Sequence, residues 1–224
     1  MAPRCSGVYF SLPSASMSAD TGAWIDGRVP PRGRLLVFEG GDGAGKSTQA
    51  ARLAAALETR GRDVLSLAFP ARGTAVGVLL NAYLRGERVL QPRVAHLLFA
   101  ANRWELADRI RDALDAGTDV VLDRYWYSGA AYTMALECGA DADWCAAPER
   151  GLPRADVVFY LECDTAVALA RGKGAERYER VAFQDKVAAA FETLVARAPA
   201  TAQRIDASAP ADAVHAAVLR ALDQ

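Results

Sequence analysis

The stretch Gly-Gly-Asp-Gly-Ala-Gly-Lys-Ser-Thr at residues 40–48 decides the fold class of this chain. It satisfies the P-loop pattern, in which a glycine, four further residues and Gly-Lys-Ser/Thr form a phosphate-binding loop. The apolar residues 35–38 before the loop predict a β-strand, and residues 46–60 after it have the apolar spacing of an amphipathic helix. A strand, a glycine-rich loop and a helix in this order predict that the loop binds the phosphates of a nucleotide.

The residues of the loop, together with one acid elsewhere, predict how a nucleotide and its metal would bind. Backbone N–H groups and the positive end of the helix surround a phosphate, Lys46 reaches the β- and γ-phosphates, and the Ser47 hydroxyl contacts Mg²⁺. Asp123 follows another apolar run, where P-loop proteins keep an acid that holds Mg²⁺ directly or through water. We therefore expect ATP as co-substrate, Mg²⁺ as its metal, and an ATP site that contains Gly40, Asp42, Gly43, Ala44, Gly45, Lys46, Ser47 and Thr48.

From residue 35 onward, short apolar runs alternate with amphipathic stretches. Strands are predicted at residues 35–38, 63–69, 119–122, 155–161 and 203–206. Helices are predicted at residues 46–60, 73–84, 92–116 as one helix or two, 129–138, 165–170, 181–197 and 211–222. Nearly continuous apolar strands are typical of a parallel sheet covered on both faces. We expect a three-layer α/β fold of the P-loop NTPase type, with a five-stranded parallel sheet and helices on both faces.

The composition narrows the class of partner. The 224 residues suffice for one three-layer domain, and the formal net charge of −1 provides no basic field that would attract nucleic acid. No apolar run approaches the ~18 residues needed to cross a membrane. The four cysteines form no Cys-x-x-Cys pair and the two histidines lie far from them, so neither a zinc site nor a disulfide framework is predicted. We expect a cytoplasmic protein that binds small molecules, with no nucleic-acid or membrane partner.

Residues 1–33 differ in composition from the rest of the chain. They mix Ser, Pro, Gly and isolated aromatic residues without a period, and they end in a Pro-Pro-Arg-Gly turn sequence. We expect a flexible N-terminal extension at residues 1–33 and a globular domain at residues 34–224. Asp20 and Asp26 interrupt the acid-poor pattern of a mitochondrial transit peptide, so mitochondrial targeting is the less favoured interpretation.

Arginines follow two of the predicted strands, and ligands in open α/β sheets bind beyond the carboxyl ends of strands. Arg72 comes after the strand at 63–69, and Arg124 comes after the strand at 119–122. Arginine binds phosphate oxygens in a bidentate manner, and a single ATP does not need so many guanidinium groups beside a P-loop. Either arginine alone would be an ordinary surface residue, but together they predict a second phosphorylated ligand that faces the first.

Phe99 and Arg103 lie four residues apart on one predicted helix and therefore share a face. An aromatic ring beside a planar donor suits a nucleobase, with stacking from the ring and a hydrogen bond from the guanidinium. Spacing alone, however, favours a core phenylalanine and a surface arginine. His96, one turn before Phe99, is expected to be structural because nothing nearby makes it a catalytic partner.

Six segments of the chain, in this order, resemble one family. They are FEGGDGAGKSTQ at 38–49, FPAR at 69–72, HLLFAANRWE at 96–105, DRYWYSGAAYT at 123–133, GLPRADVVFYL at 151–161 and ERYERVAFQ at 176–184. Together they resemble thymidylate kinase, a nucleoside monophosphate kinase, and they are most similar to its eukaryotic and viral branch. The likeness extends from residue 35 to the C-terminus, so residues 34–224 are expected to be the kinase domain and the extension lies outside it.

The resemblance implies phosphoryl transfer from ATP to dTMP, giving dTDP and ADP, in the synthesis of dTTP. Arg72 and Arg124 would clamp the phosphate of dTMP, Phe99 would stack on thymine, and Arg103 would bond to the base at O4. Asp42 looks like the family's carboxylate for the deoxyribose 3′-hydroxyl. The further residues that the resemblance assigns to the dTMP site are Ser128, Gly129 and Tyr132 around the base and Tyr178 at the sugar.

On the ATP side, the resemblance implies that Arg171 stacks on adenine and that the loop containing Ser208 closes this pocket. Residues 171–182 resemble the mobile lid of the family. A homodimer is also expected from the family.

The chain departs from the eukaryotic pattern at Gly43, where that pattern usually has a basic residue. The missing charge would then come from the lid, with Arg177 as the first candidate and Lys173 as the second. The expected catalytic residues are therefore Lys46, Arg124, Arg177 and Lys173.

Three other functions remain open. A kinase acting on another nucleotide, such as UMP, or on a nucleoside would keep the P-loop and change the acceptor pocket. Arg72 and Arg124 argue against a bare nucleoside, which would leave two cations unpaired. A regulatory GTPase would need an Asn-Lys-x-Asp motif, and the sequence has none. A non-catalytic nucleotide-binding protein is the least favoured alternative because the motifs around Lys46, Asp123 and Arg124 are intact.

Overall fold

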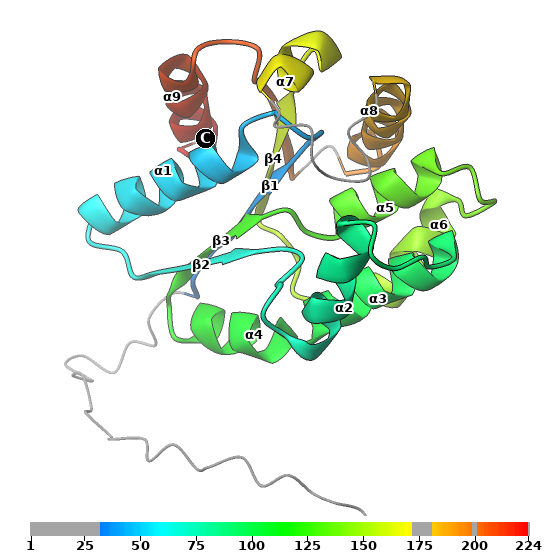
Figure 1. Cartoon of the computed structure of the whole chain (residues 1–224). Coiled ribbons are helices and arrows are strands. Elements are labelled where there is room, and N and C mark those ends of the chain that lie inside the picture. The colour runs from blue at the N-terminus through cyan, green and yellow to red at the C-terminus, as the bar shows by residue number, and fades with distance from the viewer. Residues whose placement is uncertain (1–31, 172–180, 199–200, 224) are drawn as a thin grey trace, which may run out of the picture. The chain divides into compact units, whose positions relative to one another are not determined.

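A parallel β-sheet forms the centre of the domain in the computed structural model, which describes residues 32–171, 181–198 and 201–223 (Figure 1). Its five strands are β1 (Leu35–Glu39), β2 (Val64–Ala68), β3 (Asp119–Asp123), β4 (Val157–Glu162) and β5 (Ala202–Asp206). They are arranged in the order β2-β3-β1-β4-β5 and pair in parallel throughout. The predicted α/β fold with a five-stranded parallel sheet is confirmed, and each strand lies within two residues of its predicted bounds.

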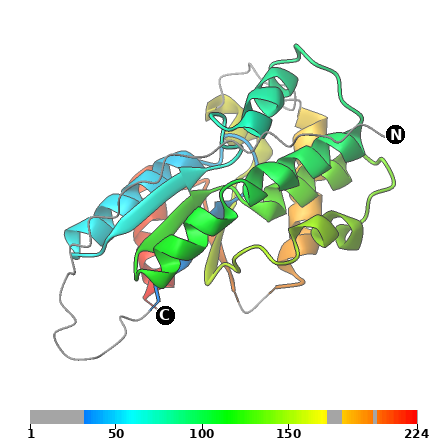
Figure 2. The ribbon, with the colours of Figure 1, turned by 90° about the horizontal axis from the view of Figure 1, so that it is seen from below.

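Helices cover both faces of the sheet (Figure 2). One face packs against α1 (Lys46–Thr59) and α9 (Ala211–Leu222), and the other against α4 (Ala107–Asp115), α5 (Trp126–Ala135) and α8 (Val181–Val195). Alternate residues of a strand point to opposite faces, so Leu36 and Phe38 of β1 enter the first core while Leu35 and Val37 enter the second. This two-sided burial explains why β1 is apolar at every one of its first four positions.

The remaining helices lie beyond the carboxyl ends of the strands or beside the sheet. They are α2 (Ala75–Leu84), α3 (Pro92–Trp104), α6 (Ala142–Ala146), the short 3₁₀ helix η1 (Ala147–Glu149) and α7 (Thr165–Arg171). The helix predicted at 92–116 is divided into α3 and α4 at residues 105–106. The sequence did not predict α6 and η1, which contain only five and three residues and so show little periodicity.

Helix α5 begins three residues earlier than predicted, at Trp126, and it also ends three residues earlier, at Ala135. The carboxylate of Glu39 accepts hydrogen bonds from the backbone N–H groups of Tyr125 at 2.8 Å and Ser128 at 3.2 Å. A side chain from β1 thus satisfies the first N–H groups of α5, and no local capping residue marks the beginning of this helix.

Two stretches of the chain bear on the predicted domain limits and lid. Gly33 donates from its backbone N–H to the carbonyl of Leu114 at 2.8 Å, and Arg32 pairs with Asp156. Both residues, which the sequence placed in the extension, therefore contact the domain. Lys173, Arg177 and Tyr178 of the predicted lid lie outside the described residues. Within the part of the chain that the structure describes, every helix is too short or too polar to traverse a bilayer.

Candidate active site

The P-loop connects the end of β1 to the beginning of α1, at the centre of the sheet's carboxyl edge. Gly43 has φ +77°, and a Cβ atom at this position would lie 2.0 Å from the carbonyl oxygen of Ala168 in α7. Only glycine fits here, because a side chain would be strained by the backbone angle and would also overlap α7. The sequence around residue 43 therefore folds as a tight loop that has helix α7 against it.

Lys46 is the first residue of α1 and is 5% exposed. Its ammonium group donates to the carbonyl of Gly41, which holds the side chain back over the loop. Burial and the nearby Arg124 lower the pKa of Lys46, Asp42 and Asp123 act to raise it, and the net result is a pKa of about 7. A bound phosphate would add negative charge and favour the protonated lysine.

Ser47 and Asp123 form the candidate metal site. The Ser47 hydroxyl donates to Oδ2 of Asp123 at 2.5 Å. The other oxygen, Oδ1 of Asp123, is buried and has no hydrogen-bond partner among the described residues. A hydroxyl and a carboxylate oxygen are the hard ligands that Mg²⁺ prefers, so these two residues fit the metal. No group of three or more His, Cys, Asp or Glu side chains that could hold a metal occurs within the described residues.

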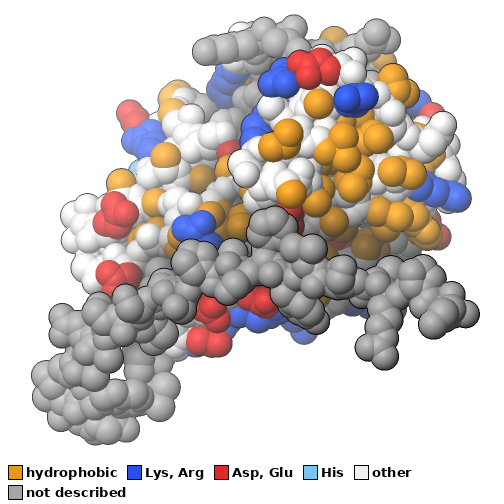
Figure 3. Space-filling model, turned by 60° about the horizontal axis from the view of Figure 1, so that its bottom comes forward, with side chains coloured by type: hydrophobic (Ala, Val, Ile, Leu, Met, Phe, Trp, Pro, Cys, Tyr) orange, Lys and Arg blue, Asp and Glu red, His pale blue; other side chains and the backbone are white. Residues whose placement is uncertain are grey.

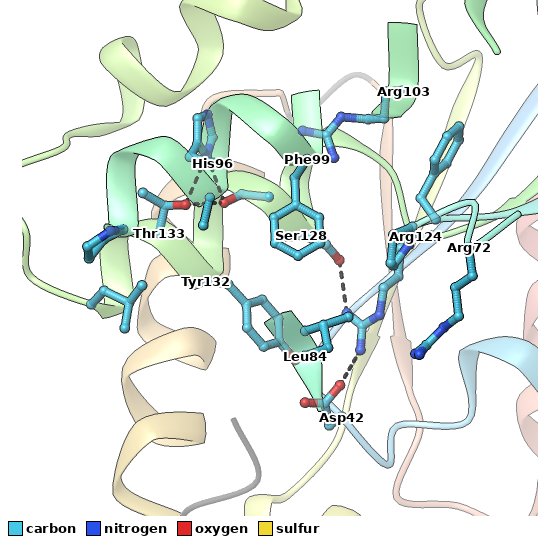
Figure 4. A pocket seen from close by; sticks show the side chains of 16 residues that line it. Asp42, Arg72, Leu84, His96, Phe99, Arg103, Arg124, Ser128, Tyr132 and Thr133 are labelled. Carbon is cyan, nitrogen blue, oxygen red and sulfur yellow. Dashed lines mark hydrogen bonds and ion pairs between the residues drawn. The ribbon is translucent and has the colours of Figure 1, made fainter. Parts of the chain in front are cut away.

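Arg124 joins the P-loop to helix α5. Its backbone is left-handed, with φ +68°, a conformation that costs a residue other than glycine about 1–3 kcal/mol and is concentrated at functional sites. Nη1 donates to the carbonyl of Gly40 at 3.1 Å and to the hydroxyl of Ser128 at 3.0 Å, and Nη2 donates to Asp42 (Figure 4). The structure thus brings the predicted residues Asp42, Arg124 and Ser128 together.

The carboxylate of Asp42 lies between Arg124 and Gln184 of α8, whose Nε2 donates to Oδ2 at 3.0 Å. Burial acts to raise the pKa of Asp42, but Arg124 and Lys46 outweigh it, so the pKa is lowered and the group is charged at neutral pH. Gln184 received no role from the sequence, although it closes one of the segments that carried the resemblance. Only the folded chain shows that it faces the P-loop.

A cavity of about 150 Å³ opens beside Arg124 and extends between α3 and α5 (Figure 4). Its lining includes all of the described residues that were predicted to bind dTMP, which are Asp42, Arg72, Phe99, Arg103, Arg124, Ser128, Gly129 and Tyr132. The ring of Phe99 meets that of Tyr83 edge-on, with 6.5 Å between centroids, and Tyr132 lies beneath the guanidinium of Arg124 at 5.4 Å. The described residues that were predicted to bind dTMP therefore line a single pocket.

Arg103 corrects the expectation drawn from spacing alone, which favoured a surface arginine. It is 2% exposed and pairs with Glu149 of η1, with Nε donating to Oε2 at 2.8 Å and Nη2 donating to Oε1. Gly129 of α5 makes room for it, because a Cβ at Gly129 would lie 2.8 Å from Nη2. Sequence reasoning missed Glu149, since no motif links it to a partner 46 residues away.

Arg72 follows β2 and lines the same cavity, where its Nη1 donates to Oδ1 of Asn81. The turn that presents it is held by Asn102, whose Oδ1 accepts from the N–H of Ala71 at 2.7 Å. Arg72 and Arg124 thus reach one pocket from neighbouring strand ends, as predicted from their positions in the sequence.

On the other side of the P-loop, Arg171 lies against the loop that follows β5. Its Nη1 donates to the carbonyl of Ala207 at 2.7 Å and its Nη2 to the carbonyl of Ser208 at 3.1 Å. Ser208 also accepts, through its hydroxyl, the N–H of Asp164 at 3.2 Å. The two residues predicted for the adenine side are therefore adjacent. Thr48, which was placed in the ATP site, is exposed on α1 beside Ser47.

His96 is 1% exposed and connects α3 to α5 and α6. Nε2 lies 2.9 Å from the carbonyl of Cys145, and Nδ1 lies 2.9 Å from the hydroxyl of Thr133. Burial lowers the pKa of His96, so the ring is neutral at physiological pH and can donate through Nε2 to the Cys145 carbonyl. These contacts agree with the structural role predicted for it.

The fold and the paired sites define a P-loop kinase. A family model for thymidylate kinase matches residues 38–218, and the chain belongs to this family. Thymidylate kinase from Arabidopsis thaliana is 44% identical over 82% of this chain and 70% of its own length, and that from Homo sapiens is 43% identical over 82% and 87%. The structure of thymidylate kinase from Candida albicans matches with a TM-score of 0.78 and 36% identity, covering 86% of this chain and 92% of that one. The activity is the ATP-dependent phosphorylation of dTMP to dTDP.

Proposed function

We propose that dTMP binds in the cavity between α3 and α5 and accepts the γ-phosphoryl group of ATP bound over the P-loop. The observation that supports this assignment is the position of Arg124. Its Nη1 donates both to the carbonyl of Gly40 in the P-loop and to the hydroxyl of Ser128 in the cavity. A cation in contact with both sites can neutralise charge on the two substrates at once.

Within the cavity, we place the phosphate of dTMP between Arg72 and Arg124, thymine over the ring of Phe99, and O4 of the base at Arg103. Asp42 would accept a hydrogen bond from the 3′-hydroxyl of the sugar. In this arrangement the dTMP phosphate would replace Asp42 as the hydrogen-bond partner of Nη2 of Arg124. The carboxylate of Asp42 would then be available to the sugar.

The chemistry requires positioning and charge neutralisation more than proton transfer. An oxygen of the dTMP phosphate forms a bond to the γ-phosphorus, the bond from that phosphorus to the β–γ bridging oxygen breaks, and ADP leaves. The nucleophile is already anionic, so no general base is needed. Lys46 and Arg124 would neutralise charge on the transferring group. Arg177 and Lys173, outside the described residues, remain our proposed lid donors for the charge that Gly43 lacks.

We propose that Ser47 and Asp123 hold Mg²⁺ with the phosphates of ATP, with Asp123 acting directly or through water. When bound, the ion would neutralise charge on the β- and γ-phosphates. The buried, unpartnered Oδ1 of Asp123 supports this assignment, because a carboxylate oxygen without a donor is costly in the absence of a cation.

A coupled assay of ADP release with dTMP, dUMP, dCMP, dGMP, UMP and thymidine tests the acceptor site. We expect dTMP to be the preferred substrate and dCMP to be poor, because its 4-amino group would face a donor of Arg103. Thymidine should not be phosphorylated, since it offers no phosphate to Arg72 and Arg124. Turnover of dCMP comparable to that of dTMP, or any turnover of thymidine, would contradict the assignment of the cavity as the dTMP site.

We propose that the protein is a homodimer, joined through the outer faces of α2 and α3, which pack against each other. Val78 and Leu79 of α2 are 63% and 37% exposed, and Val94 and Leu97 of α3 are 47% and 48% exposed. Hydrophobic side chains gather on this side of the molecule (Figure 3). Large exposed apolar patches mark interaction sites, and a face of one chain can bury itself against the same face of a second copy.

We propose a cytoplasmic location and small-molecule partners without nucleic acid. The near-neutral net charge supports the absence of a nucleic-acid partner. Fluorescence imaging of the full chain, with and without residues 1–33, would test the location, and a mitochondrial signal that depends on these residues would contradict it.

A further inference from the structure

Arg103 and Glu149 form an ion pair beside the cavity that is almost completely buried. The exposed fraction of the side chain is 3% for Arg103 and 5% for Glu149. Glu149 accepts from both Nε and Nη2, with one carboxylate oxygen for each nitrogen. Two parallel hydrogen bonds fix the plane of the guanidinium as well as its position, which a single contact would not do.

The bonds to Glu149 leave one edge of the guanidinium directed elsewhere. Nη1 of Arg103 has no hydrogen-bond partner among the described residues, and Arg103 lines the cavity. Gly129 lies along this edge, where a Cβ atom would be 2.8 Å from Nη2 and 3.3 Å from Nη1. A guanidinium group has five N–H donors and no acceptor, so the edge left open by Gly129 offers donors only.

Glu149 is itself attached to the helix that carries Arg103. Trp104, the next residue of α3, donates from Nε1 to the carbonyl of Pro148 at 2.8 Å. Gly151, with φ +99°, brings the following turn against the Trp104 ring, where a Cβ atom would lie 3.1 Å from the ring edge. Two successive residues of α3 thus hold η1, and the carboxylate keeps its place relative to Arg103.

From this geometry we propose that Glu149 is a positioning residue that sets base selection through Arg103. It holds the donor edge toward a base that presents a carbonyl oxygen at C4, as thymine does, and against one that presents an amino group there, as cytosine does. The inference rests on the proposed role of Arg103 at the base. Without Glu149, the guanidinium would keep its charge but lose its fixed plane, while the residues of the P-loop would be unchanged.

The test compares kcat/KM for dTMP and dCMP in the wild type, Glu149→Gln and Glu149→Asp, well below their melting temperatures. A hydrogen bond to a charged group is worth roughly 10- to 100-fold, so the dTMP:dCMP ratio should fall at least ~10-fold in Glu149→Gln, mainly through KM for dTMP. Glu149→Asp keeps the charge but draws the carboxylate back by one methylene, so a smaller fall is expected. A wild-type ratio in Glu149→Gln overturns the proposal. If that variant does not fold, Glu149→Asp decides, and a wild-type ratio there overturns it.

Asp119→Asn is the matched control. Asp119 is also a buried carboxylate, and it pairs with Arg34 and Arg62, each at 3.1 Å. It lies at the beginning of β3, whereas the site lies beyond the end of this strand at Asp123. This variant should lower the melting temperature and leave the dTMP:dCMP ratio unchanged, which separates lost stability from lost selection.

Arg103→Met separates the proposed role of Arg103 at the base from the proposed role of Glu149. If this variant keeps the wild-type ratio, Arg103 does not read the base, and the proposed role of Arg103 fails together with that of Glu149. If the dTMP:dCMP ratio falls in Arg103→Met but stays at the wild-type value in Glu149→Gln, only the proposed role of Glu149 fails. We expect the dTMP:dCMP ratio to fall in both variants.

Discussion

Replacing Lys46 with methionine should stabilise the unliganded protein while it removes activity. Methionine has a similar length and no charge, so it fills the same space without the cost of burying an ammonium group. Under its proposed role Lys46 binds the phosphates of ATP, so its loss should abolish phosphoryl transfer.

The size of the stabilisation follows from the environment of Lys46. Burial, together with the positive charge of Arg124, brings its pKa from 10.5 to about 7. Each pKa unit corresponds to about 1.4 kcal/mol, so the folded environment as a whole opposes the protonated lysine by up to about 5 kcal/mol. The hydrogen bond to the Gly41 carbonyl, which the variant loses, offsets about 1.5–3 kcal/mol. We expect Lys46→Met to raise the free energy of unfolding at pH 7 by about 1–3 kcal/mol.

The pH dependence has a definite sign. Between pH 7 and 10.5 the unfolded chain holds a proton on this lysine that the folded protein has lost. The unfolding free energy of the wild type should therefore rise with pH in this window, by up to about 1.4 kcal/mol per unit from this group. Lys46→Met has no titrating lysine at this position, so its unfolding free energy lacks this pH dependence. Its stability advantage over the wild type should therefore shrink from pH 7 to pH 9.

Urea denaturation followed by tryptophan fluorescence at pH 7, 8 and 9 measures both effects. Lys186→Met is the control, because Lys186 is 49% exposed and its loss should change stability by less than about 0.5 kcal/mol at every pH. A Lys46→Met protein that is less stable than the wild type, or whose difference from it does not depend on pH, would show that the ammonium is not desolvated.

Three further predictions concern the cavity, the apolar face and His96. Phe99→Ala should weaken dTMP binding by about 1–3 kcal/mol in calorimetric titration, and unchanged affinity would exclude stacking there. Leu97→Asp should convert a dimer to monomers in sedimentation velocity, whereas a wild-type monomer or an unaffected dimer would refute the proposed face. Burial lowers the pKa of His96, so the unfolded chain takes up a proton first and the unfolding free energy should fall as the pH drops below about 6.5. His96→Gln should show a smaller fall in the same acid titration, and an identical fall would assign it to other groups.

The parts of this molecule that could be predicted from the sequence are those whose signal is local. The P-loop, the strands and most helices follow from spacing within about ten residues. The positions of Arg72 and Arg124 were informative because the carboxyl ends of parallel strands meet at one edge of the sheet, so their separation in sequence did not matter.

The features that the sequence missed depend on contacts between distant residues. Glu39 caps α5 through Ser128, which lies 89 residues away, and Gln184 reaches Asp42 over 142 residues. Spacing alone favoured a surface position for Arg103, because it cannot show that a buried counter-ion, Glu149, comes from another helix. Side chains that satisfy one another across a core leave no periodic pattern in the sequence.

The close approach of Gly43 to α7 also constrains the order in which this enzyme could evolve. A Cβ atom at residue 43 would need a distance of at least 3.4 Å for ordinary contact, but the carbonyl of Ala168 lies 2.0 Å from its position. A basic residue there, as in the eukaryotic pattern, would be selected against until a change in α7 had withdrawn the helix. As long as α7 stays in this position, a protein with glycine at residue 43 must keep its other phosphate-binding cations. The glycine and those cations would therefore be inherited together.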